Sequence, residues 1–465
     1  MNANQANNGV TPIQSQQVEH VDVLIIGAGI SGIGAAHHLR EQLPDKSFVI
    51  LETKESFGGT WLQHKYPGIR SDSDLYTFGY RFKPWSGKPI AEAGAILDYL
   101  DEAIEDDHLD KHIRYQHEVR AASWSSEAQR WELEVFDKAT QSTLTFTGNF
   151  LWMCQGYYRH QEGYTPDFPG IESFKGPIVH PQTWPEDLDY KGKRVVVVGS
   201  GATAATLIPN MADDCEHITM LQRSPTYFWT GENRNELADR LRELEVPEEI
   251  VHDIVRRDIL KQSKDVQYLS ASDPELVKEE LFKVIKEYVG EDFDMKHFTP
   301  SYRPWQQRLA YVPDGDLFEG IASGKVSVVT DHIERFTEDG ILTKSGELLE
   351  ADIIITATGF NLSVMGDIPF EVDGKAVDFA DAFTYRGVML SGLPNLSYMF
   401  GYFRTSWTMR VDLVCDLICR LLKTMDSKGA TVVTPTLREQ DANMTPRPWV
   451  DPEEFNPGYL QRSLH

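Results

Sequence analysis

The stretch VDVLIIGAGISGIGAAHHLR, Val21–Arg40, decides the fold of this chain. It opens with a continuous apolar run, Val21–Ile26, which is typical of a strand buried on both faces in a parallel sheet. Gly27, Gly29 and Gly32 follow, and a helical pattern then runs to about Leu43. Strand, G-x-G-x-x-G and helix stand in the order that a dinucleotide-binding Rossmann unit requires.

Each glycine of this loop has a physical task. Gly27 permits the tight turn, Gly29 lets the backbone approach a pyrophosphate, and Gly32 lets the helix pack closely on the strand. The pyrophosphate would lie at the helix N-terminus, where free N–H groups favour anions. A second predicted strand, Phe48–Leu51, ends in Glu52, whose carboxylate suits a free ribose diol.

A second glycine loop occurs in KRVVVVGSGATAATLI, Lys193–Ile208. A predicted strand, Arg194–Val198, precedes Gly199, Gly201 and Ala204, and alanine is tolerated at the third position. The next predicted strand, His217–Leu221, does not end in an acid but runs into Gln222, Arg223 and Ser224. A carboxylate there would repel a 2′-phosphate, whereas Arg223 can bind one, so we predict an NADPH site. An ordinary surface arginine is the alternative. We expect the same site to include these residues: Thr203, Ser224, Thr358 and Gly359.

The two loops lie about 170 residues apart in a chain of 465 residues, which is too long for one compact core. We therefore expect two nucleotide-binding domains, one for FAD and one for NADPH. The run ADIIITATGF, Ala351–Phe360, predicts a buried strand and a small-residue turn where the chain could pass between them. Taken alone, it indicates only a strand and a turn.

The composition excludes several classes of partner. A net charge of −26 argues against nucleic acid and anionic membrane surfaces. No apolar run approaches the roughly 20 residues that span a bilayer, and residues 1–20 resemble a disordered lead-in rather than a signal peptide. The four cysteines are irregularly spaced without Cys-x-x-Cys, which favours a reducing cytoplasm. We predict no metal site, and the sequence leaves the oligomeric state open.

Two longer motifs carry a family resemblance. FKGPIVHPQTWP fits the pattern F-x-G-x-x-x-H-x-x-x-W-P with these residues: Phe174, Gly176, His180, Trp184 and Pro185. GGTWLQHKYPGIRSD, Gly58–Asp72, fits G-x-W-x4-Y-P-G-x3-D. With both motifs the chain resembles the type I (FAD/NADPH) Baeyer–Villiger monooxygenases. Residues from about 21 to 463 resemble the branch that contains the mycobacterial ethionamide-activating monooxygenase.

The resemblance implies an α/β fold with two Rossmann-like, three-layer ββα domains and a helical insertion. The FAD-binding domain would comprise 21–155 and 361–465, the NADP-binding domain 160–230 and 301–360, and the insertion 231–300. The insertion would shape the substrate pocket, although a solvated helical hairpin explains its sequence nearly as well. Further FAD-binding residues would come from the second motif: Gly59, Thr60, Trp61 and Asp72. His180 would act as a hinge that couples NADP position to flavin chemistry.

The resemblance also implies a reaction. NADPH reduces FAD, and the reduced flavin reacts with O2 to give a C4a-peroxyflavin. As an anion, this species inserts oxygen into a ketone to give an ester or lactone, and when protonated it oxidises sulfur. Arg308 would stabilise the anion, because an arginine keeps its charge at working pH, and Asp72 would orient Arg308. Many family members have lysine before this arginine, whereas this chain has Gln307.

Two alternatives are compatible with the same motifs. A monooxygenase that oxidises only sulfur or nitrogen would share the Phe-Gly-His core of the first motif, although such enzymes usually lack its Trp-Pro ending. A flavin-binding NADPH oxidase or sensor would form no organic product.

A C-terminal helix is the last expected element. Apolar residues recur at helical spacing through Ser406–Met425, and Thr405 or Ser406 could cap its start. By resemblance, its positive end would point at the flavin. Trp61, Tyr66 and Trp407 could line the pocket, although core packing alone would also explain these aromatic residues.

Overall fold

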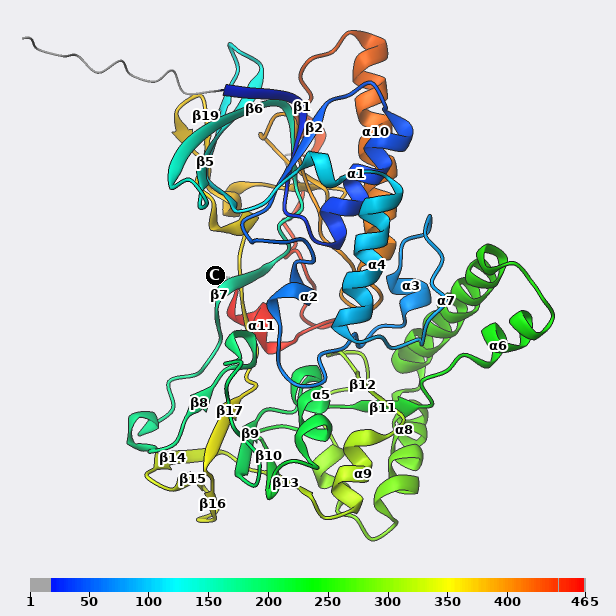
Figure 1. Cartoon of the computed structure of the whole chain (residues 1–465), viewed down its shortest axis with the longest axis vertical. Helices are drawn as coiled ribbons and strands as arrows, with labels where there is room; N and C mark the ends of the chain where they lie inside the picture. Colours follow the sequence, from blue (N-terminus) through cyan, green and yellow to red (C-terminus); the bar gives the residue numbers. More distant parts are fainter. Residues whose placement is uncertain (1–17, 442, 464–465) are drawn as a thin grey trace, which may run out of the picture.

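The computed structural model describes residues 18–441 and 443–463. Figure 1 shows two sheets, one in each half of the molecule, with strand β7 (Tyr158–Gly163) between them. β7 pairs antiparallel with β18 (Phe360–Leu362), so the chain crosses between the halves on two adjacent strands. The expected α/β fold with two Rossmann-like domains is confirmed. Residues 1–17 of the expected lead-in lie outside the described residues.

The first sheet has nine strands in the order β20-β19-β4-β5-β6-β1-β2-β3, with β23 also paired to β6. Its strands are β1 (Val18–Ile26), β2 (Phe48–Leu51), β3 (Ile113–Arg114), β4 (His117–Ser125), β5 (Arg130–Asp137), β6 (Ser142–Met153), β19 (Phe370–Val372), β20 (Lys375–Ala376) and β23 (Leu396–Tyr398). β6 runs parallel to β1 and antiparallel to β5. This long strand therefore belongs both to the parallel sheet and to the antiparallel strands beside it.

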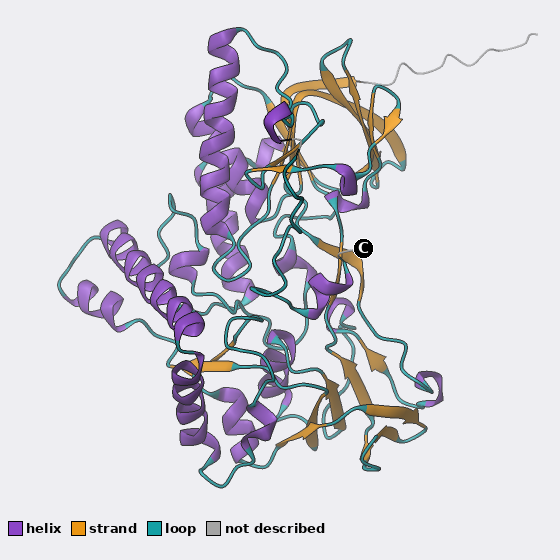
Figure 2. Cartoon of the chain, turned by 180° about the vertical axis from the view of Figure 1, so that it is seen from behind, coloured by secondary structure: helices purple, strands orange, loops and turns teal. Residues whose placement is uncertain are grey.

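Both faces of the parallel part are buried, which explains the continuous apolar run of β1. Val23 and Ile25 pack in the same core as residues of helices α1 (Ile30–Gln42), α4 (Ala93–Asp106) and α10 (Thr408–Lys428). Leu24 and Ile26 belong to the core formed with the antiparallel strands. Figure 2 shows these helices on one side of the sheet and strands on the other.

One boundary of the first strand was wrong. β1 begins at Val18 rather than Val21, so the last three residues of the expected lead-in, 18–20, are part of the sheet. Val18, Glu19 and His20 continue the parallel pairing with Thr145, Phe146 and Thr147 of β6. These residues, two of them polar, extend the strand through backbone hydrogen bonds, which an apolar pattern does not reveal.

The second sheet has five strands in the order β13-β10-β9-β17-β8. They are β8 (Ile178–Val179), β9 (Arg194–Val198), β10 (His217–Gln222), β13 (Val326–Thr330) and β17 (Ile353–Thr356). Val195 and Val197 share a core with helices α5 (Ala202–Met211) and α9 (Asp316–Ala322). The opposite face packs on the three-stranded sheet of β14 (Ile333–Thr337), β15 (Gly340–Thr343) and β16 (Leu348–Glu350).

Three helices occupy the stretch expected to be an insertion: α6 (Glu236–Glu243), α7 (Glu248–Ser272) and α8 (Pro274–Val289). The side chain of Asp273 accepts a hydrogen bond from the Leu276 N–H, as its place before Pro274 predicts. Figure 1 shows α6 and α7 at the outer edge of the molecule. Among the described residues, no helix is both long and apolar enough to cross a bilayer.

The start of α10 differs from the expectation. Trp407 occupies the N-cap position, and no side chain caps the helix there. Ser406 Oγ instead lies 2.5 Å from Thr77 Oγ1, and Thr405 Oγ1 donates to Met409 Sδ. A tertiary contact therefore uses the Ser406 hydroxyl, and a side chain in the first turn of α10 uses the Thr405 hydroxyl.

Short elements complete the described chain. The strands are β11 (Phe228–Gly231), β12 (Ala310–Pro313), β21 (Thr384–Tyr385) and β22 (Met389–Leu390). The short helices are α2 (Thr60–Gln63), α3 (Leu75–Phe78) and α11 (Gly458–Arg462). Single 3₁₀ turns lie at 110–112, 171–173, 181–183, 295–298, 365–367, 379–381 and 439–441.

Candidate functional site

The first glycine loop forms a cradle lined by backbone. Gly27 has φ +102°, and a Cβ there would lie 2.8 Å from the carbonyl oxygen of Cys154. A Cβ on Gly29 would lie 3.5 Å from the Cα of Gly59, so the two motifs face each other without intervening side chains. Gly32 packs against the Gly27 carbonyl at the start of α1. The bare backbone leaves room for a pyrophosphate at the N-terminus of α1.

Glu52 ends β2 inside the same crevice. Its Oε2 accepts a hydrogen bond from the Ala28 N–H at 2.7 Å, and its Oε1 accepts one from the Lys54 N–H at 2.9 Å. The side chain is buried, and burial raises the pKa of Glu52 above its ordinary value. The carboxylate is thus fixed by the backbone of the glycine loop, at the place where a ribose diol would bind.

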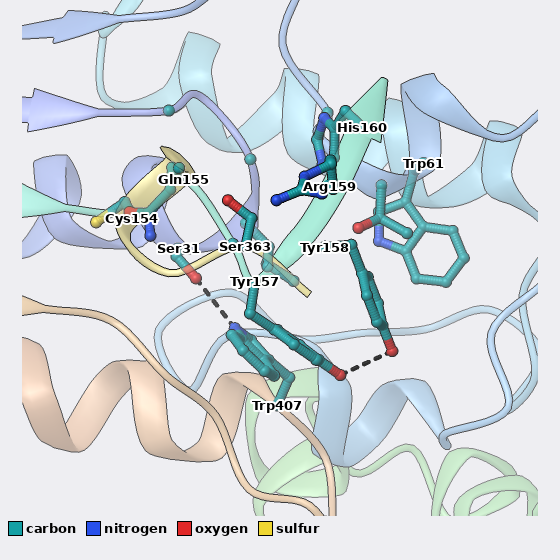
Figure 3. Close-up of a pocket in the computed structure, with 18 of the residues that line it drawn as sticks. Ser31, Trp61, Cys154, Gln155, Tyr157, Tyr158, Arg159, His160, Ser363 and Trp407 are labelled. Atoms are coloured by element: carbon teal, nitrogen blue, oxygen red, sulfur yellow. Dashed lines mark hydrogen bonds between the residues drawn. The ribbon is translucent and has the colours of Figure 1, made fainter. Parts of the chain in front are cut away.

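One pocket extends from this cradle to Arg308. Its lining includes Gly27, Gly29, Glu52, Gly59, Thr60, Trp61, Asp72, Tyr157, Arg308 and Trp407. Figure 3 shows Trp61, Tyr157, Tyr158 and Trp407 gathered around it. The structure therefore brings Arg308, which is far away in the sequence, to the pocket of the first glycine loop.

Arg308 is held by the second motif. Its Nη2 donates to Asp72 Oδ1 at 2.8 Å and to Ser73 Oγ at 2.9 Å. Its side chain is 38% exposed and that of Asp72 is 28% exposed, so the pair lines the pocket wall rather than the core. Burial opposes the charge, but Asp72 and the neighbouring tyrosines raise the pKa of Arg308 above its ordinary value. The guanidinium is therefore a permanent positive charge in the pocket.

Aromatic side chains form the wall beside Arg308. Tyr157 stacks on Trp407 with ring centroids 5.0 Å apart, and its hydroxyl donates to the Tyr158 hydroxyl at 2.8 Å. Trp407 Nε1 donates to Ser31 Oγ at 3.0 Å, which fixes the start of α10 against α1. Figure 3 shows both hydrogen bonds. Trp407 thus lines the pocket and also packs against the core.

The second motif ties the two halves together. Tyr66 is buried in the core of the second sheet, although its chain neighbours Trp61 and Asp72 line the pocket. Arg70 Nη1 donates to Asp316 Oδ2 of α9 at 2.6 Å. The segment 58–72 therefore runs from the first glycine loop to the second sheet.

His180 connects the first motif to the crossing strands. Its Nε2 lies 3.1 Å from the carbonyl oxygen of Gly359, and its Nδ1 accepts from the Gln182 N–H at 3.2 Å. This pattern assigns the ring proton to Nε2. Burial lowers the pKa of His180, so the ring is neutral. Through this ring, the motif contacts the turn that leads into β18.

The other residues of this motif have packing positions. Phe174 is buried in the core between the second sheet and the three-stranded antiparallel sheet of β14, β15 and β16. A Cβ on Gly176 would collide with the Asp352 carbonyl. Trp184 packs on the core between the second sheet and helices α5 and α9. The Pro185 carbonyl oxygen accepts a hydrogen bond from the Leu188 N–H. These contacts hold the motif along the edge of the second sheet.

The second glycine loop has the expected geometry. Gly199 has φ +129°, Gly201 is the N-cap residue of α5, and Ala204 is buried in the core of the second sheet. Arg223 and Ser224 follow β10 and are exposed. Thr203 lies in the first turn of α5. Thr358 Oγ1 donates to the Tyr164 carbonyl, and the next residue, Gly359, accepts from His180.

None of the described residues that line the pocket comes from the stretch 231–300. α7 instead contacts the segment that follows Asp72. The buried Arg256 donates through Nη1 to the carbonyl oxygens of Tyr76, Thr77 and Gly79. Helix α7 therefore contacts the segment behind the pocket wall, and the shaping of the substrate pocket by this stretch stays a prediction.

Sequence comparison identifies the family. The flavin-binding monooxygenase-like family matches residues 88–391, and an NAD(P)-binding Rossmann-like domain matches residues 25–87. The chain belongs to the flavin-binding monooxygenase-like family. It is 48% identical to the FAD-containing monooxygenase EthA of Mycobacterium tuberculosis over 450 residues, which cover 96% of this chain and 90% of that protein. EthA of Mycolicibacterium smegmatis is 46% identical over 449 residues, which cover 96% and 90%. The expected resemblance to this branch and the expected cofactors, FAD and NADP(H), are confirmed.

Solved structures share the fold of this flavin-binding monooxygenase. An NADP-bound steroid monooxygenase has a TM-score of 0.73 at 24% identity, over 90% of this chain and 88% of that chain. Cyclohexanone monooxygenase with bound ε-caprolactone has a TM-score of 0.74 at 22% identity, over 90% of each chain. At these identities the similarity concerns the fold alone.

Sequence reasoning missed four tyrosines at the pocket: Tyr157, Tyr158, Tyr402 and Tyr459. Tyr157 and Tyr158 lie four and five residues after the end of β6, which pairs in parallel with β1. Because ligands bind at the carboxyl ends of parallel strands, their position after this strand was an available signal. Tyr459 reaches the pocket from α11, and no local pattern in the sequence marks it.

Proposed function

We propose that this monooxygenase uses NADPH and O2 to insert oxygen into ketones, giving esters or lactones. The observation that carries the proposal is the Arg308–Asp72 pair at the wall of the pocket that begins at the first glycine loop. A guanidinium is the cation best suited to stay charged beside a developing oxygen anion.

The pocket fits FAD in the chemistry of its residues. The backbone cradle at Gly27, Gly29 and Gly59 suits a pyrophosphate, and Glu52 suits a ribose diol. Trp407 and the start of α10 line the same pocket as Arg308, and Trp407 donates to Ser31 beside the first glycine loop. When bound, FAD would take a hydride from NADPH and activate O2 for transfer to the substrate.

The protein residues would supply a positive charge and would exclude water. Arg308 would keep the transferred oxygen anionic, the form that attacks a carbonyl carbon, and Asp72 would hold the guanidinium in place. Trp61, Tyr157 and Trp407 would exclude water from the pocket. His180, hydrogen-bonded to Gly359, would link movement of the first motif to the turn after β17.

The two halves would divide the cofactors between them. We assign FAD to residues 21–155 and 361–465, and NADP(H) to 160–230 and 301–360, with 231–300 as the helical insertion. Support comes from the two sheets, each of which carries one glycine loop. Thr203, Arg223, Ser224, Thr358 and Gly359 would form the NADP site. The exposed Arg223, with no acid at the end of β10, favours NADPH over NADH.

Oxidation of sulfur is the second candidate activity. The hydroxyls of Tyr157 and Tyr158 lie in the same pocket as Arg308 and can donate hydrogen bonds to an oxygen there. A protonated oxygen is electrophilic and reacts with sulfur rather than with a carbonyl carbon. Sulfoxidation is therefore proposed as a side activity. An enzyme restricted to sulfur and nitrogen is the alternative to ketone oxidation.

A product screen tests the proposal. Purified, FAD-loaded protein is given NADPH, O2 and, in parallel, a linear ketone, a cyclic ketone, an aryl ketone and a thioether. Ester or lactone from any ketone supports the proposal. Sulfoxide without ester supports the alternative, and H2O2 equal to all NADPH consumed would indicate an oxidase.

The state of the cysteines indicates the cellular compartment in which the enzyme works. The thiols of all four are free, and those of Cys154, Cys415 and Cys419 are buried. We propose that it works in the reducing cytoplasm.

A further inference from the structure

The C-terminal segment places a second arginine at the NADP side of the molecule. Arg462 lies at the end of α11, and its guanidinium carbon is 3.5 Å from the ring centroid of Tyr164. Its Nη2 is 3.5 Å from the Phe360 carbonyl oxygen and 3.5 Å from where a Gly359 Cβ would lie. Arg462 is therefore positioned at the turn after β17, beside the carboxyl end of the second parallel sheet.

This charge lacks compensation within the described part of the chain. No carboxylate in residues 18–441 and 443–463 lies within ion-pair distance of Arg462, although the chain carries a net charge of −26. Arg223 follows β10, and Arg462 lies beside the turn after β17, so both guanidinium groups belong to the carboxyl edge of the same parallel sheet. Burial lowers the pKa of Arg462, Tyr164 opposes this effect, and Arg223 adds to it. Two positive charges at one edge of a sheet form a favourable site for an anion.

Residues next to Arg308 hold the segment that delivers this arginine. The Asn456 N–H donates to the Gln306 carbonyl at 2.9 Å, and Gln307 Nε2 lies 3.4 Å from Asn456 Oδ1. Arg303 and Arg404 both pair with Glu454. Gln307, at the position where many family members have lysine, thus contacts the C-terminal segment.

We propose that Arg462 binds a phosphate group of NADP(H) together with Arg223. The inference rests on the proposed use of NADPH and deepens it, because it names a second contact from the opposite end of the chain. Ligands of open α/β sheets bind at the carboxyl ends of the strands, which is where Gly359 and Arg462 meet. The ring of Tyr164 holds the guanidinium flat and leaves its edge available to phosphate oxygens.

Equilibrium binding to the FAD-loaded protein tests this inference without any turnover. Dissociation constants of NADP+ and NAD+ are measured by calorimetry for the wild type, Arg462→Ala, Arg462→Lys and Tyr164→Leu. We expect Arg462→Ala to weaken NADP+ binding about tenfold or more, with a smaller loss in Arg462→Lys and Tyr164→Leu. Arg438→Ala is the matched control, because Arg438 lies in the same segment but pairs with Asp441.

The two nucleotides distinguish the phosphate that is bound. If Arg462→Ala weakens the binding of NADP+ alone, Arg462 contacts the 2′-phosphate. If it weakens the binding of NADP+ and NAD+ equally, Arg462 contacts the pyrophosphate. Unchanged binding of both in Arg462→Ala would overturn the inference. If the wild type itself fails to prefer NADP+, the proposed NADPH preference fails instead, so the two failures are distinguishable.

Proteolysis gives a second readout. Trypsin cleaves after Arg462, and the loss of residues 463–465 is visible in the intact mass. We expect saturating NADP+ to slow this cleavage in the wild type while cleavage after Arg438 continues unchanged. Equal rates at Arg462 with and without NADP+ would contradict a cofactor contact there.

Discussion

Arg308 donates a hydrogen bond to Asp72 at 2.8 Å, although 236 residues separate the two in the chain. Asp72 ends a motif that begins beside the first glycine loop, and Arg308 comes from the stretch after the helical insertion. The pair therefore joins the two halves of the molecule at the wall of the pocket. Its geometry makes the proposed role of each residue testable by itself.

Asp72→Asn removes the negative charge but keeps an oxygen that can accept from Arg308. We expect oxygenation to fall by about tenfold to a hundredfold, because a charge-assisted hydrogen bond becomes a neutral one. The dissociation constant of NADP+ should remain unchanged. Product formation and NADP+ binding are measured together. Ser73→Ala, which removes only the second acceptor of Arg308, is the control and should have a smaller effect. Wild-type product formation by Asp72→Asn would argue against the orienting role.

Arg223→Ala should remove most of the preference for NADPH. The loss of a charge-assisted bond to the 2′-phosphate corresponds to about 1.5–3 kcal/mol, or roughly tenfold to a hundredfold. Steady-state rates with NADPH and NADH give the ratio for the wild type, Arg223→Ala and Arg223→Lys. Arg223→Lys should keep part of the preference because it keeps the charge. An NADPH/NADH ratio that Arg223→Ala leaves intact would contradict the assignment.

Glu52→Ala should purify with little flavin. The variant loses the carboxylate that we assign to the ribose diol, together with the acceptor for the Ala28 N–H. We expect FAD to bind about tenfold more weakly or worse. Glu52→Gln should lie between the wild type and alanine, because its amide oxygen can still accept from Ala28. Flavin absorbance per mole of protein is the measurement. Full occupancy in Glu52→Ala would exclude the proposed contact.

Because of the buried His252, we expect the free energy of unfolding to fall in acid. Burial lowers its pKa from 6.5 to about 4, and the unfolded chain binds the proton first as the pH falls. Its contribution is therefore present above pH 6.5 and is lost between pH 6.5 and about 4, by roughly 3 kcal/mol when complete. His252 Nδ1 accepts from the Trp85 N–H, and asparagine can replace that acceptor without titrating. Urea unfolding at about pH 7 and about pH 4 should show a smaller loss in His252→Asn than in the wild type. Equal losses would show that His252 is not responsible.

The sequence predicted the local parts of this structure well. Both glycine loops, the strands that precede them and the start of α8 at Pro274 depend on neighbours in the chain, so their patterns are visible in one dimension. The same reasoning failed at the start of α10. Thr405 and Ser406 are residue types that often cap helices, but the Ser406 hydroxyl has a tertiary partner in Thr77 and the Thr405 hydroxyl donates to the side chain of Met409.

The candidate site was predictable only in part. Residues inside the motifs, such as Glu52 and Asp72, could be assigned from spacing and resemblance. The contact between Arg308 and Asp72 depends on how two sheets meet, which no spacing in the sequence encodes. Tyr459 was missed because it reaches the pocket from a short C-terminal helix without a motif. Contacts of this kind depend on tertiary packing alone.

The most direct test of the account is product analysis of Arg308→Ala with a ketone that the wild type oxidises. The FAD-loaded variant should still be reduced by NADPH, and the consumed NADPH should appear as H2O2, with ester formation down by about a hundredfold or more. Arg438→Ala is the control, since Arg438 pairs with Asp441 and is not among the residues of the pocket. Ester formation by Arg308→Ala at the wild-type rate would contradict the central claim that the charge of Arg308 drives oxygen insertion.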